Sequence, residues 1–115
     1  MVSKVTVTKA YTAQYSNPIR FDAGESVTVG REDDTFPGWY WCRDGRGREG
    51  WVPARLLDDT QGPTTGRRTY SAQELTVAGG EGGELIQRFG GWVEARLDDG
   101  RVGWLPETHV RVDDR

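Results

Sequence analysis

The chain contains two copies of one short sequence pattern in the same order. Each copy has an apolar-x-apolar pair, two further residues and Gly-Glu, then a Trp, and finally Gly-Trp-apolar-Pro. The pieces are 19–25, Trp39 and 50–53 in the first copy, and 75–81, Trp92 and 103–106 in the second. This repeat predicts two small structural units of the same kind rather than one domain of ordinary size.

The spacing between equivalent residues shrinks along the chain. It is 59 positions between Tyr11 and Tyr70 and 56 between Gly24 and Gly80. From the pair Trp39 and Trp92 onwards it is 53. The second copy therefore lacks three residues in each of two places. Loops tolerate such changes of length, whereas a one-residue slip within a strand would turn every side chain to the other face of its sheet. We therefore expect a variable loop at each of the two places.

The segments between these loops alternate in polarity. Val27 and Val29 alternate with polar residues, and so do Val93 and Ala95. A period of two is typical of half-buried strands, and Gly-containing turns separate the strands without any helical periodicity. The sequence thus predicts an all-β fold.

Residues 58–66 contain no apolar side chain, so we place the first unit at 1–58, a linker at 59–66 and the second unit at 67–115.

The composition agrees with two very small cores. Units of roughly 50–60 residues bury little surface and are marginally stable. Five Trp, four Tyr and three Phe let such a core bury more area per residue, and they also supply adhesive binding surfaces. The net charge of −3 and the mixing of arginines with acids count against binding to nucleic acid.

Further classes of protein are disfavoured by what the sequence contains. One Cys allows no internal disulfide, and the first residues show no apolar signal segment, so we expect a cytoplasmic location. No stretch approaches the length of a membrane span, so we expect no membrane contact. A single His leaves no set of nucleophile, base and orienting group for catalysis and no metal site, so we expect neither an enzyme nor a cofactor. Gly45–Gly50 fits G-x-G-x-x-G, but a strand-like segment follows it where a phosphate-binding helix is required.

The ordered pieces of both copies resemble the Src-homology-3 (SH3) domains, in particular their bacterial variants. That family has an opening aromatic, a long first (RT) loop, an apolar-x-apolar pair before Gly-Glu, a second (n-Src) loop, a Trp and a closing Gly-aromatic-apolar-Pro. The resemblance covers nearly the whole chain outside the linker. It implies two small five-stranded barrels in tandem.

The resemblance also implies a groove between the two loops that receives an extended, often Pro-rich peptide in polyproline II form. The matching positions, together with the replacements of the family's last groove tyrosine, are Tyr11, Trp39, Pro53 and Leu56 in the first copy and Tyr70, Trp92, Pro106 and His109 in the second. Acids that the family carries in the first loop stand here in the second loop, as Glu32, Asp33 and Asp34. We expect Trp39 and Trp92 to be exposed on the groove floor and the first copy to be the better binder.

Other positions favour structural roles. We expect Trp51 and Trp104 to cover the barrels and Cys42 to be buried and inert. Gly83 stands where the first copy has Val27, which predicts a thinner second core. The leading hypothesis is a non-catalytic protein-interaction module for a peptide of a partner protein. The alternative is a module that binds bacterial cell wall or carbohydrate.

Overall fold

The computed structural model describes residues 3–114, which form strands joined by turns and two short 3₁₀ helices within that range. The chain makes two compact units. Unit 1 combines the chain up to Gln14 with the chain from Gln73 onwards, and unit 2 is the continuous stretch Tyr15–Ala72.

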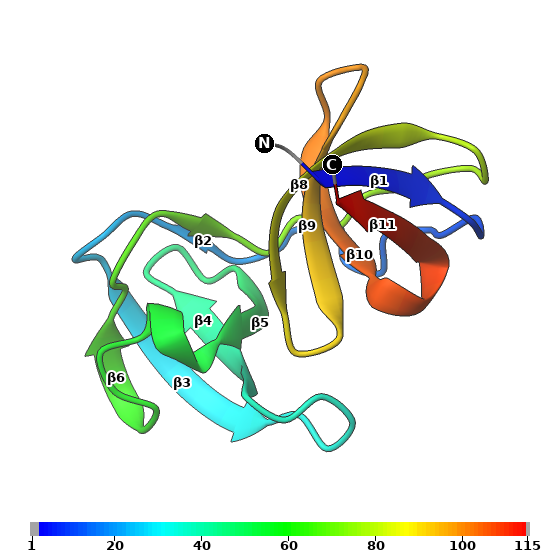
Figure 1. The fold of residues 1–115 in the computed structure, drawn as a ribbon. Helices are drawn as coiled ribbons and strands as arrows, with labels where there is room; N and C mark the ends of the chain where they lie inside the picture. The colour runs from blue at the N-terminus through cyan, green and yellow to red at the C-terminus, as the bar shows by residue number, and fades with distance from the viewer. Residues whose placement is uncertain (1–2, 115) are drawn as a thin grey trace. The chain divides into compact units, whose positions relative to one another are not determined.

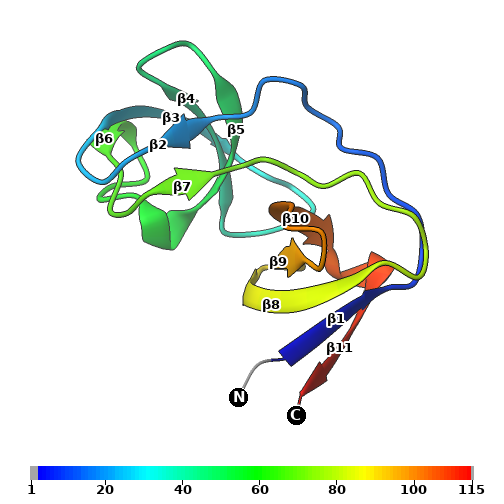
Figure 2. The same ribbon diagram turned by 90° about the horizontal axis from the view of Figure 1, so that it is seen from above.

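Unit 1 is built on an antiparallel sheet that joins the start and the end of the chain (Figure 1). Within the described residues the strand order is β10-β9-β8-β1-β11. Strand β1 pairs on one side with β11 and on the other with β8, and β1 and β11 run side by side in Figures 1 and 2. The elements are β1 (Ser3–Val7), β8 (Gly82–Phe89), β9 (Trp92–Leu97), β10 (Val102–Pro106), the 3₁₀ helix η2 (Glu107–His109) and β11 (Val110–Asp114).

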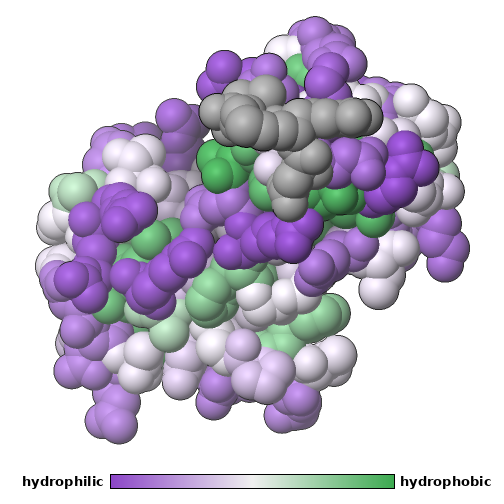
Figure 3. Space-filling view, in the orientation of Figure 1, coloured by the Kyte–Doolittle hydropathy of each residue, from purple (hydrophilic) through white to green (hydrophobic). Residues whose placement is uncertain are grey.

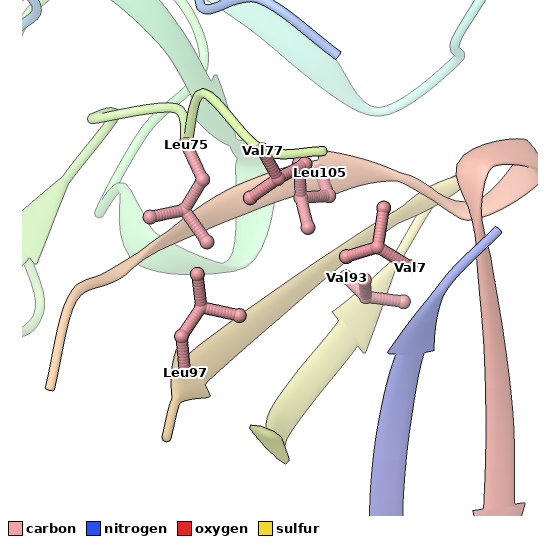
Figure 4. Close-up of a cluster of buried hydrophobic side chains, with 6 residues drawn as sticks. All are labelled: Val7, Leu75, Val77, Val93, Leu97 and Leu105. Carbon is pink, nitrogen blue, oxygen red and sulfur yellow. The ribbon is translucent and has the colours of Figure 1, made fainter. Parts of the chain in front are cut away.

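The core of unit 1 draws on both parts of its chain. The alternation in β1 turns its apolar residues inward, and β9 and β10 supply the facing side chains. Their side chains point toward one another in Figure 4, with two more from the segment before β8. The buried cluster consists of Val7, Leu75, Val77, Val93, Leu97 and Leu105.

Unit 2 has the same plan. Its sheet has the order β5-β4-β3-β6 within the described residues, and β2 pairs separately with β7. The elements are β2 (Arg20–Phe21), β3 (Ser26–Glu32), β4 (Trp39–Asp44), β5 (Glu49–Pro53), the 3₁₀ helix η1 (Ala54–Leu56), β6 (Gly62–Thr65) and β7 (Tyr70–Ser71). Its core includes Ile19, Phe21, Val27, Val52, Leu56 and Leu57.

The strand pairing shows that the two copies exchange their opening segments. Strand β1 pairs with β8 at Thr6 opposite Gly82, and β6 pairs with β3 at Thr65 opposite Ser26. These two pairs are equivalent, because the repeat offsets of 59 and 56 positions carry one onto the other. Strand β6 is therefore the opening strand of the second copy. It completes unit 2, while the opening strand of the first copy completes unit 1.

The units consequently do not follow the predicted ranges 1–58 and 67–115. In sequence terms unit 2 is inserted into unit 1 between Gln14 and Gln73. Residues 59–66 were predicted to be a linker, and half of them form β6 instead. Their lack of apolar residues has a physical reason: β6 is an edge strand with exposed or half-exposed side chains, where Pro63 is tolerated.

Close packing requires glycine at two positions of the repeat, one at Gly83 and one shared by Gly50 and Gly103. A Cβ at Gly83 would overlap the backbone carbonyl oxygen of Arg96, so strand β9 passes too close for any side chain there. Gly83 is thus required by backbone packing in unit 1, whereas Val27 fills the equivalent place in unit 2. In the Gly-Trp-apolar-Pro motif, a Cβ at Gly50 would lie 3.0 Å from Ile19 and one at Gly103 would lie 3.0 Å from Leu75.

Candidate functional site

The exchange regroups the residues expected to line the grooves. In unit 1 the ring of Tyr11 packs edge-on against Trp92, with centroids 6.2 Å apart, and against His109, with centroids 5.4 Å apart. All three rings are half-buried. Tyr11 comes from the first copy, and the other two residues come from the second. Sequence analysis named all three residues as groove candidates, but it grouped Tyr11 with Trp39.

Pro106 completes this aromatic surface. It lies opposite Trp92 in the β9–β10 ladder and immediately precedes η2, whose last residue is His109. Pro106 is half-exposed. We call the set Tyr11, Trp92, Pro106 and His109 surface A.

A buried carboxylate fixes the orientation of Tyr11. The Tyr11 hydroxyl donates to Oε1 of Glu74 at 3.0 Å, and the backbone N–H of Gln14 donates to the same oxygen at 2.8 Å. Glu74 is only 9% exposed. Sequence reasoning missed Glu74, because the first copy has Pro18 at the equivalent position and the repeat therefore gave no signal.

The equivalent residues in unit 2 are buried. Trp39, Leu56 and Tyr70 are each 4% exposed, and Pro53 is fully buried. Tyr70 packs against Phe21 at 5.7 Å, and its hydroxyl donates to the backbone carbonyl of Trp51 at 2.8 Å. The structure therefore does not show the exposed floor expected at Trp39.

The acids of the β3–β4 loop are used mainly within the loop. Oε2 of Glu32 accepts the backbone N–H of Gly38 at 2.9 Å, and Oδ2 of Asp33 accepts that of Phe36 at 3.2 Å. Asp34 is exposed. Two of the three predicted ligand-binding acids thus hold the loop in shape.

A second aromatic cluster lies in unit 2. Trp41 of β4 stands opposite Trp51 of β5, with ring centroids 5.1 Å apart, and Tyr15 packs against Trp41 at 5.4 Å. The Trp51 indole N–H donates to the Tyr15 hydroxyl at 3.4 Å, and the guanidinium of Arg31 lies 5.1 Å from the centre of the Trp51 ring. Sequence analysis expected Trp51 to have a structural role and did not identify Tyr15, Arg31 or Trp41 as surface residues of interest. The signal was available, because Trp41 shares a strand face with Trp39.

Cys42 is buried as predicted, and burial raises the pKa of its thiol to about 12. Within residues 3–114 no group of His, Cys, Asp and Glu side chains is placed to hold a metal ion. No helix in that range is long and apolar enough to cross a membrane.

The fold is all-β and consistent with an SH3-like barrel. Residues 4–58 match the family model for the variant SH3 domain. A comparison with solved structures gives no significant match. SH3 domains are in general non-catalytic modules that bind protein or peptide partners. The matched stretch begins in unit 1 and continues into unit 2, so the family pattern follows the sequence copy and not the compact unit.

Proposed function

We propose that this chain is a non-catalytic interaction module that binds an extended peptide of a partner protein at surface A. The observation that supports this most directly is the packing of Tyr11 against Trp92 and His109, with all three rings half-exposed. Tyrosine and tryptophan give large contact areas at a low cost in conformational entropy. Such rings suit a polyproline II segment, which is already ordered before it binds.

The surface is held in place before any ligand arrives. Glu74 fixes the Tyr11 hydroxyl, and the β9–β10 ladder fixes Trp92 opposite Pro106. Fixed side chains lose little further freedom on binding, which raises the affinity that a given contact area provides. On the face that Figure 3 presents, apolar residues lie between polar ones.

The proposal is tested by a titration of the whole chain with a library of Pro-rich peptides, followed by amide and side-chain NMR spectra. We expect shifts at Tyr11, Trp92 and His109, and their loss in Trp92→Ala. The control is Ile86→Ala, which truncates a side chain that is 47% exposed on β8 outside surface A. It should leave the titration unchanged.

Two results would contradict the proposal. The first is a well-dispersed spectrum that does not change at millimolar peptide. The second is binding to cell-wall sacculi in place of peptide, which would favour the carbohydrate-binding alternative.

A further inference from the structure

The aromatic cluster of unit 2 lies on the outer face of its sheet. Trp41 and Trp51 are cross-strand partners, and the neighbouring pair on the same face is Arg43 opposite Glu49. Tyr15, which is 39% exposed, covers one side of Trp41. These rings are held together on the surface, in contrast to the buried side chains of the core.

The second copy shows that the fold does not require this cluster. Glu94 stands at the position of Trp41 in the repeat, and its Oε1 accepts the side-chain N–H of Gln87 at 2.8 Å. Trp104, the counterpart of Trp51, is only 2% exposed. In unit 1 the equivalent cross-strand pair is therefore Glu94 opposite Trp104, and no ring stands at the position of Trp41. Exposed aromatic residues that stability does not require are typical of an interaction surface.

Arg31 gives the cluster an unbalanced positive charge. Its guanidinium lies over the Trp51 ring, 5.1 Å from the ring centre, and among the residues that the structure describes it forms no ion pair. The neighbouring Arg43 is balanced by Glu49 at 3.5 Å. A guanidinium that lies over a ring face keeps N–H groups in its own plane, where they can donate to a carboxylate.

The tilt of the rings indicates the shape of the ligand. Trp51 is inclined by 73° and Tyr15 by 58° to the plane of Trp41. The three rings thus do not form one flat platform of the kind on which a sugar ring stacks. Inclined faces suit the side of a proline ring or of an aromatic side chain.

We propose that Tyr15, Trp41, Trp51 and Arg31, which we call surface B, bind a second kind of peptide segment, one with a proline or aromatic residue next to an acidic residue. The rings contact the apolar side chain, and Arg31 pairs with the acid. Surface B shares no residue with surface A, so this inference does not depend on the function proposed for surface A.

The test uses the whole chain and three synthetic peptides. The first is built from proline, phenylalanine and glutamate, the second has lysine in place of glutamate, and the third has serine in place of the apolar residues. The readout is the indole N–H signals of Trp41 and Trp51. We expect the first peptide to shift both signals. We expect Arg31→Glu, and also Trp41→Thr, which leaves the charge unchanged, to weaken binding by about tenfold or more.

The matched control is Arg46→Glu, which makes the same change of charge at an exposed hairpin position outside surface B. It should bind like the unmodified chain. The proposal is overturned if the lysine peptide binds as well as the glutamate peptide, or if both arginine variants weaken binding equally. It is also overturned if only surface A signals shift, or if an oligosaccharide shifts these indoles and the peptides do not.

Discussion

Asp44 organises the turn between β4 and β5 through a single buried carboxylate. Oδ1 accepts the backbone N–H groups of Arg46 and Arg48, at 2.8 and 3.0 Å. Oδ2 accepts Nε of Arg48 at 2.7 Å and the backbone N–H of Arg20 at 3.2 Å. Burial by itself raises the pKa of Asp44, but these donors together hold it below the ordinary value of 3.8. The ionised form is therefore the native one.

Replacing Asp44 by Ala should lower the free energy of unfolding of unit 2 by about 2–3 kcal/mol, because several donors would lose a charged acceptor. A depressed native pKa stabilises the fold above pH 3.8, and this stabilisation is lost as the pH falls through the native value. Urea unfolding at pH 7 and pH 3 checks both statements. A loss at pH 7 well below about 2 kcal/mol would contradict the first statement, and an equal loss at both pH values would contradict the second.

Cys42 should be chemically silent in the native state. With a pKa of about 12, roughly one thiol in ten thousand is ionised at pH 8. We expect labelling by a disulfide reagent to be slow in buffer and fast in denaturant. Because the native pKa is raised above the ordinary 9.0, stability should also decline as the pH rises past about 9. Rapid labelling without denaturant would refute the assigned burial.

The strands themselves could be predicted from the sequence, but their partners could not. Alternation and the repeat offsets identified the segments around Val27, Trp39 and Val93 and the loops between them. The exchange was not detectable, because β1 and β6 hold equivalent places in the two copies and nothing local to either strand marks whether it pairs with β3 or with β8. Which edge each strand joins depends on long-range pairing, which local periodicity does not report.

The candidate site was predictable to a similar extent. The residue types of surface A followed from the family resemblance. The contact between Tyr11 and Trp92 could not be predicted, because it arises from the exchange of the opening strands. Glu74 and Arg31 act through contacts between distant segments, so no sequence motif marked them.

Gly83 tests the pairing of β8 with its neighbours. Gly83→Ala should destabilise unit 1 by about 2–4 kcal/mol, because the new Cβ would collide with the backbone of β9. Gly79→Ala is the control, since a Cβ there would lie 3.8 Å from the Thr8 carbonyl oxygen, an ordinary contact. Thermal unfolding measures both. Similar melting temperatures for the two variants would contradict the close approach of β9.

The exchange determines which pieces of the chain can fold alone. Unit 2 is continuous, so the fragment 15–72 should unfold cooperatively by itself. The fragment 1–58 contains a whole sequence copy but lacks β6 and β7, and it leaves β1 without β8 and β11. We expect circular dichroism and urea titration to show a folded 15–72 and a largely unfolded 1–58. The reverse order of stability would contradict the account.

The central claim, reciprocal exchange of opening strands, is tested most directly by nuclear Overhauser effects between backbone protons of the intact chain. The structure predicts cross-strand contacts of Val5 with Gly83 and Val112, and of Thr64 with Val27. A mixture of isotope-labelled and unlabelled chains distinguishes contacts within one molecule from contacts between two molecules. Contacts of Val5 with Val27 instead would show that each copy completes its own barrel, and the account would then fail.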